Sequence, residues 1–144
     1  MDRSLAMETV DLESSRFLMA ASSSAESLDL PVPTCPEWDM AELVKHLGFV
    51  HWRAGLVVSE RRTEAPDKSR LPPAPDGAAL VGWFAERRMA MLAAFDAADG
   101  ETPVWNWTPN SPGPTSFWFR RMAASFFPVM RDGGMCGTPN SLRR

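Results

Sequence analysis

The chain of 144 residues contains no tyrosine, and it has only two cysteines and two histidines beside six tryptophans. No apolar run approaches the roughly 20 residues that a membrane-spanning helix needs, so we expect no membrane partner. Basic residues form no block and the net charge is −3, which argues against a nucleic-acid partner. No apolar segment of a secretion signal follows the first residues. Cys35 and Cys136 stand in different contexts and demand no disulfide. We therefore expect a cytoplasmic protein.

The length predicts one domain with a single substantial core. Hydrophobic residues make up 44% of the chain and charged residues 23%, which is ordinary for a globular protein. We expect the domain to occupy residues 1–123. The stretch from Asp132 to Asn140 has no helical period and is rich in glycine, so residues 124–144 are predicted to form a divergent, disordered tail.

The stretch from Pro31 to Trp52 marks the entry into a helix. Its prolines exclude a helix over residues 31–36. Asp39 is then suited to be the N-cap, and Glu42 stands at the third helical position of a capping box. Trp38 and Leu43 are spaced as a hydrophobic staple. These signals together place the start of a helix just after Asp39.

Both histidines belong to this helix. From Met40 onward, the apolar residues recur with helical spacing. With Leu47 at the centre of the apolar face, His51 lies about 40° away and His46 about 100° away. His51 is therefore predicted to point into the core, with His46 on its flank. Inward histidines of a bundle helix either bind a metal or are hydrogen-bonded structural residues, and spacing leaves both alternatives open.

Four helices in all are predicted, arranged as an all-α, up-down-up-down bundle with an incomplete fourth helix. The first is expected from Leu5 to Leu28 and the second from Met40 to Arg61 or Arg62. The third runs to Ala98, with Asp76 as its N-cap and Gly100 in the left-handed conformation behind it. The fourth begins at Phe117, capped by Thr115 or Ser116, and Pro128 interrupts it.

Two long connections separate the later helices. Thr63 to Pro75 contains four prolines, and we favour a solvated linker over a lid that lines a substrate site. The second connection, Glu101 to Ser116, carries Trp105 and Trp107. Two exposed tryptophans are costly, so they either cover one end of the bundle or border a pocket. Covering is the more common case.

Three stretches carry a resemblance to a known family. Residues 32–38 read VPTCPEW, residues 41–48 read AELVKHLG, and residues 117–123 read FWFRRMA. Together they resemble the N-terminal, metal-binding domain of mycothiol-dependent maleylpyruvate isomerase, a branch of the DinB-like helical bundles. Glu37 stands where the family usually has glycine. The resemblance implies a DinB-like four-helix bundle.

The resemblance also implies a metal site and its chemistry. In the family the first histidine of the second helix ligates the metal, and that position is His46, whereas periodicity slightly favours His51. A divalent metal, usually zinc, and mycothiol are the implied cofactors. A metal-bound thiol is deprotonated and nucleophilic. In the isomerase it adds to maleylpyruvate, allows rotation about the former double bond, and leaves as fumarylpyruvate forms. The implied partners are a small thiol and a small-molecule substrate.

The sequence departs from the family at the residues that complete this site. The family continues into an H-E-x-x-x-H segment, but here Ser125 replaces the glutamate and Val129 the second histidine. Catalytic zinc normally has three protein ligands, so two of three are lost. We expect a truncated or frame-altered relative. Two functions remain open: a metal-binding, thiol-dependent isomerase or transferase, and a non-catalytic helical remnant or binding module without metal.

Overall fold

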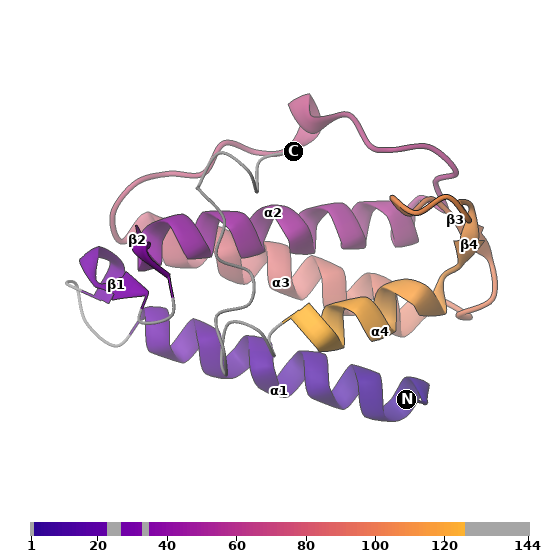
Figure 1. Cartoon of the computed structure of the whole chain (residues 1–144), viewed down its shortest axis with the longest axis horizontal. Helices are drawn as coiled ribbons and strands as arrows, with labels where there is room; N and C mark the ends of the chain where they lie inside the picture. The colour runs from indigo at the N-terminus through magenta and orange to yellow at the C-terminus, as the bar shows by residue number, and fades with distance from the viewer. Residues whose placement is uncertain (1, 23–26, 33–34, 126–144) are drawn as a thin grey trace.

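The computed structural model describes residues 2–22, 27–32 and 35–125 (Figure 1). Within these residues, four helices form the body of the molecule: α1 (Arg3–Ala21), α2 (Met40–Ser59), α3 (Ala79–Ala97) and α4 (Ser116–Ser125). The prediction of an all-α four-helix bundle is confirmed. The predicted helix break at Pro128, the ligand position Val129 and nearly all of the predicted tail lie outside the described residues.

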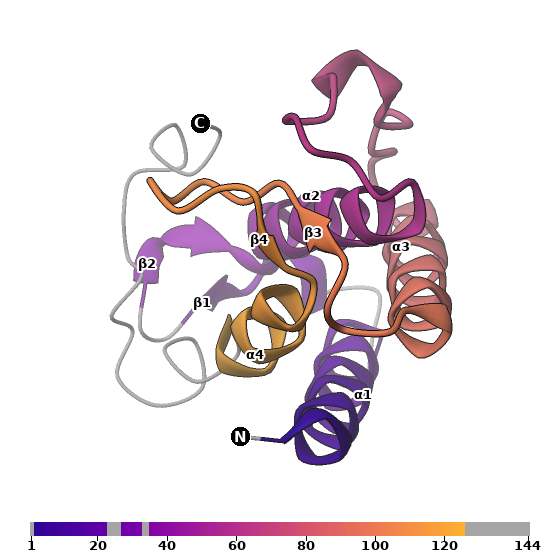
Figure 2. The ribbon, with the colours of Figure 1, turned by 90° about the vertical axis from the view of Figure 1, so that its right-hand side faces the viewer.

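The direction of α3 corrects the predicted up-down-up-down order. Gly48 in the middle of α2 lies against Trp83 in the first half of α3, and Gly55 lies against Met91, about two turns further along both helices. The two helices therefore run parallel, and α4 lies beside α1 (Figures 1 and 2). The reason is the connection of residues 60–78, which is long enough to return along the whole bundle. Short connections are the ones that produce antiparallel neighbours.

Helix α1 begins earlier and ends earlier than predicted. Asp2 is its N-cap, because its carboxylate accepts a hydrogen bond from the Leu5 amide at 2.8 Å. At the other end, the Ser22 hydroxyl donates to the Leu18 carbonyl at 2.7 Å. Serine competes for backbone groups in this way and favours helix ends. A separate 3₁₀ turn, Ser27–Asp29, follows.

The predicted N-cap at the start of α2 is present. The short antiparallel strands β1 (Pro31–Val32) and β2 (Cys35–Asp39) lead into it. Asp39 accepts a hydrogen bond from the Glu42 amide at 2.8 Å, so the N-cap prediction is confirmed. Trp38 and Leu43 are both buried in the same core cluster. The hydrophobic residues on either side of the cap therefore fix how the chain enters the helix.

Helix α3 begins later than predicted, and Asp76 does not cap it. The N-cap is Ala78, which makes no side-chain capping bond. Asp76 instead forms an ion pair with Lys45 of α2, 3.0 Å from Nζ. Behind α3, Gly100 has a positive φ of 88°, as expected for a glycine that turns the chain away from a helix end. A pattern of residue types cannot show that an acidic side chain has a competing partner 31 positions away.

The core consists of two clusters along the bundle. One gathers around Trp118, Phe119 and Phe95, and the other around Trp83 and Phe84. Between α3 and α4, β3 (Pro103–Val104) pairs with β4 (Gly113–Pro114) and shapes the connection that carries the tryptophans. The 3₁₀ turn Lys68–Arg70 lies in the other connection. No helix of the described residues is long and apolar enough to cross a membrane.

Candidate functional site

His46 lies on the flank of α2, as its position in the helical pattern predicts. Its ring is half-buried and meets the Trp38 indole edge to face, with the ring centroids 5.9 Å apart. Burial, and then the charge of Arg53, lower the pKa of His46 to about 4. The imidazole is therefore neutral at neutral pH. This is the form that can ligate a metal, but it is a weak base.

His51 points into the core, which confirms the prediction made from its spacing. Its side chain is fully buried, and its ring lies 5.2 Å from that of Phe84. Burial lowers the pKa of His51 to about 3, with smaller contributions from Arg88 and His46. His51 does not share the surface on which His46 lies, because five helical positions turn it by about 140°.

Arg53 is the residue of this site that sequence reasoning missed. It follows His46 by seven positions, or about two helical turns on the same face. Its guanidinium carbon lies between 5.1 and 5.7 Å from the centres of four aromatic rings, those of Phe49, Trp105, Trp107 and Trp118. The seven-residue spacing was a usable signal, but three of the four rings come from residues more than 50 positions away.

The guanidinium of Arg53 lacks part of its usual hydrogen bonding. Its Nε atom is buried and has no hydrogen-bond partner among the described residues. Burial, and then the charge of Arg121, lower the pKa of Arg53. Arg121 itself lies 5.5 Å from the Trp107 ring centre. Two positive groups thus flank one indole, at a place where a negative ligand would stabilise both.

The sequence left open whether the two loop tryptophans cover one end of the bundle or border a pocket, and the two residues differ in this respect. Trp105 is half-buried, and its carbonyl accepts a hydrogen bond from the Trp118 indole at 2.8 Å. Its own amide donates to the Arg62 carbonyl at 2.7 Å. Trp105 therefore covers the end of the bundle, as expected. Trp107 remains 44% exposed and borders the surface beside Arg53.

The described residues around His46 do not form a zinc site. No group of three or more histidine, cysteine, aspartate or glutamate side chains that could hold a metal exists among residues 2–22, 27–32 and 35–125. Ser125, which the resemblance places at a ligand position, is the last residue of α4. Arg53 acts electrostatically on His46, and a cation there disfavours a second, divalent one.

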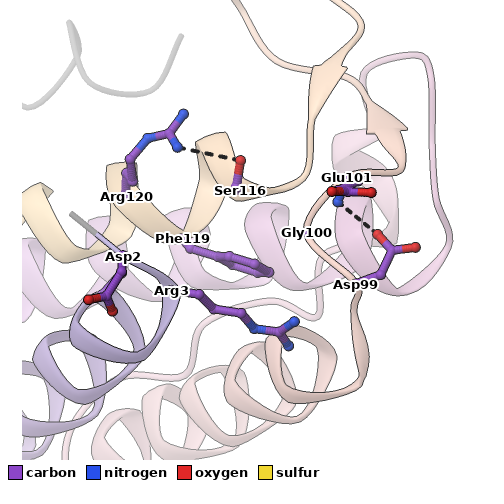
Figure 3. A pocket seen from close by; sticks show the side chains of 9 residues that line it. Asp2, Arg3, Asp99, Gly100, Glu101, Ser116, Phe119 and Arg120 are labelled. Atoms are coloured by element: carbon purple, nitrogen blue, oxygen red, sulfur yellow. Dashed lines mark hydrogen bonds between the residues drawn. The ribbon is translucent and has the colours of Figure 1, made fainter.

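A separate cavity of about 250 Å³ lies where the first turns of α1 and α4 meet the end of α3 (Figure 3). Its arginines are already engaged. Arg3 donates to the carbonyl groups of Phe95 and Asp96 at 3.0 and 3.2 Å, and Arg120 approaches the Ser116 hydroxyl at 3.4 Å. Three carboxylates, those of Asp2, Asp99 and Glu101, line the same space. The mixed charge gives no preference for a ligand of either sign.

A family model described as the mycothiol maleylpyruvate isomerase N-terminal domain matches residues 11–125. The chain belongs to this family. No curated protein and no solved structure matches the chain. The family match includes the cap at Asp39, His46, Arg53 and both loop tryptophans. It ends at Ser125.

Proposed function

We propose that this chain is a metal-independent binding member of the family, which takes a small organic acid at the face of α2 that carries His46 and Arg53. The observation that carries the proposal is the guanidinium of Arg53. It is enclosed by four aromatic rings, and its buried Nε has no hydrogen-bond partner among the described residues. No catalytic step is assigned to the chain.

The chemistry of this enclosure supports a carboxylate ligand. A guanidinium presents its N–H groups as a planar fork that matches a carboxylate, and the interaction strengthens where water is excluded. Arg121 adds a second positive charge beside Trp107. The neutral imidazole of His46 adds a polar group without adding a competing charge. The family description names maleylpyruvate, which is itself an organic acid.

The alternative is the zinc- and mycothiol-dependent isomerase or transferase chemistry that the family implies. It would use His46 as a metal ligand. Two observations count against it: Ser125 and Val129 stand at the other ligand positions, and Arg53 places a positive charge near His46. With a pKa of about 4, His46 is also too weakly basic to deprotonate a thiol efficiently without a metal.

The test is a titration of the metal-free protein with maleate, followed by NMR of the His46 imidazole and the Trp107 indole. We expect saturable shifts of both signals. Arg53→Met removes the charge but keeps an apolar stem among the rings, and it should abolish those shifts. Arg16→Gln changes an exposed arginine of α1 that pairs with Glu13, and it should leave them intact. Equal shifts in the wild type and Arg53→Met would refute the proposal.

A further inference from the structure

A second cavity, of about 300 Å³, lies on the side of α2 that faces away from His46. It opens between α2, α3 and the connection of residues 60–78. Helix α2 supplies His51, Gly55 and Ser59, the connection supplies Arg70 and Pro72, and α3 supplies Arg87. Gly55 is nine positions after His46, or about 180° around the helix. The cavity is therefore independent of the site proposed above.

The connection is fixed as the outer wall of this cavity. Arg70 donates two hydrogen bonds to the two carboxylate oxygens of Glu60, at 2.8 and 2.7 Å. The Trp83 indole donates to the Pro72 carbonyl at 2.9 Å. In this part of the connection Leu71 and Ala74 pack on the core, while Arg70 and Pro72 remain exposed as expected of a solvated linker. Arg70 and Pro72 of the connection also border the cavity, as the alternative expectation of a lining segment requires.

The charged side chains that line the cavity are all positive. Arg70 and Arg87 both border the cavity, and no carboxylate does. The carboxylate of Glu60 balances the positive charge of Arg70. Hydrogen bonds from Arg70, and then from Arg62, lower the pKa of Glu60 to about 2. Arg87 is less fully matched. Its Nη2 pairs at 3.0 Å with Glu86, a side chain that is 73% exposed, and exposed pairs of this kind are weak.

The remaining amino group of Arg87 has no acceptor. Its Nη1 is buried and makes no hydrogen bond to any described residue, while the guanidinium lies 5.8 Å from the Trp83 ring centre. A buried charged donor without an acceptor is unfavourable. A ligand that supplies an acceptor would relieve this cost. The apolar lining, which includes Leu56 and Pro72, suits the hydrocarbon part of such a ligand.

We propose that this cavity is a binding site for a small organic carboxylate, with Arg87 Nη1 as the donor to its oxygen and Pro72 and Leu56 against its apolar body. A carboxylate oxygen matches the one amino group of the guanidinium that has no acceptor among the described residues. Inorganic phosphate offers the same acceptor oxygens but no apolar body. The proposal does not depend on the function proposed for the His46 face.

The experiment is a titration of the full chain with benzoate, monitored by NMR of the Trp52 indole and the His51 imidazole, which both border the cavity. We expect saturable shifts of both signals, with inorganic phosphate binding more weakly. Arg87→Gln should weaken benzoate binding about tenfold or more, since hydrogen bonds to charged groups are the stronger ones. Arg120→Gln, at an exposed residue of α4, is the matched control and should bind as the wild type does.

A second variant keeps Arg87 and tests the cavity by another route, in case Arg87→Gln fails to fold. Ala90→Leu adds bulk to the exposed α3 position that borders the cavity, and leucine is a good helix former. It should also weaken benzoate binding while the melting temperature stays near that of the wild type. The proposal is overturned by any of three results: no saturable shifts in the wild type, unchanged affinity in folded Arg87→Gln, or phosphate binding as tight as benzoate.

Discussion

Arg53 lies two turns after His46 on the same face of α2, and its positive charge acts on the imidazole of His46. Burial is the larger cause of the low pKa of His46, and Arg53 is the second. This pair defines the candidate site: a neutral histidine and, two turns further along the same helix face, a cation held among aromatic rings. Its electrostatic link can be measured directly.

Arg53→Met should raise the pKa of His46 above its value of about 4, yet keep it below 6.5, because burial still disfavours the charged imidazole. NMR titration of the imidazole signals measures this change. His51 is an internal control, since Arg53 is not among the causes of its low pKa. An unchanged pKa of His46 would show that the two residues do not interact as described.

Acid should destabilise the protein before its carboxylates titrate. The pKa values of His46 and His51 are lowered from 6.5 to about 4 and about 3. Below about pH 6.5 the two histidines therefore bind protons in the unfolded chain, whereas they stay neutral in the folded chain until a lower pH. The free energy of unfolding must fall as the pH drops through this window, by up to about 1.4 kcal/mol per pH unit for the fully buried His51 and less for the partly solvated His46.

Urea unfolding at pH 7 and pH 5 measures this slope. His51→Leu removes one of the two titrating groups and should make the slope shallower, whatever it does to stability at pH 7. Histidines elsewhere do not complicate the result, because the chain has only two. A free energy of unfolding that rises or stays constant between pH 7 and pH 5 in the wild type would contradict the burial described for both rings.

Two glycines in the parallel helix pair should respond in opposite ways to alanine. A β-carbon on Gly48 would overlap the ring of Trp83, whereas one on Gly82 would meet no atom within 4 Å. Gly48→Ala should therefore destabilise the protein by about 1–3 kcal/mol through overpacking. Gly82→Ala should stabilise it by up to about 1 kcal/mol, because alanine is the better helix former. Thermal unfolding compares the two, and equal effects would refute the packing of α2 on α3.

The end of α2 offers a stabilising substitution. Arg61 has a positive φ of 50°, and the Arg62 amide donates to the Val57 carbonyl at 3.0 Å. This is the arrangement in which glycine is preferred. Arg61→Gly should raise the free energy of unfolding by about 0.5–1 kcal/mol, since glycine adopts this conformation without a steric cost. Arg62→Gly, one residue later, lacks that gain and should not stabilise the protein.

Local sequence signals predicted the structural features that depend only on residues close together in the chain. The cap at Asp39 and the inward position of His51 follow from a few adjacent side chains and the helical period. The sequence did not reveal the direction of α3, because a long connection permits either direction. It also did not reveal the enclosure of Arg53, which forms only when Trp105, Trp107 and Trp118 come together in the fold.

The most direct test of the account is calorimetric titration of maleate into the protein, with EDTA present and then with added zinc. With the second cavity disabled by Arg87→Gln, we predict saturable binding in EDTA, no gain from zinc, and loss of binding when Arg53→Met is added. The opposite result is binding that requires stoichiometric zinc and disappears, with the zinc, in His46→Ala. That result would show that the chain keeps the metal chemistry of its family.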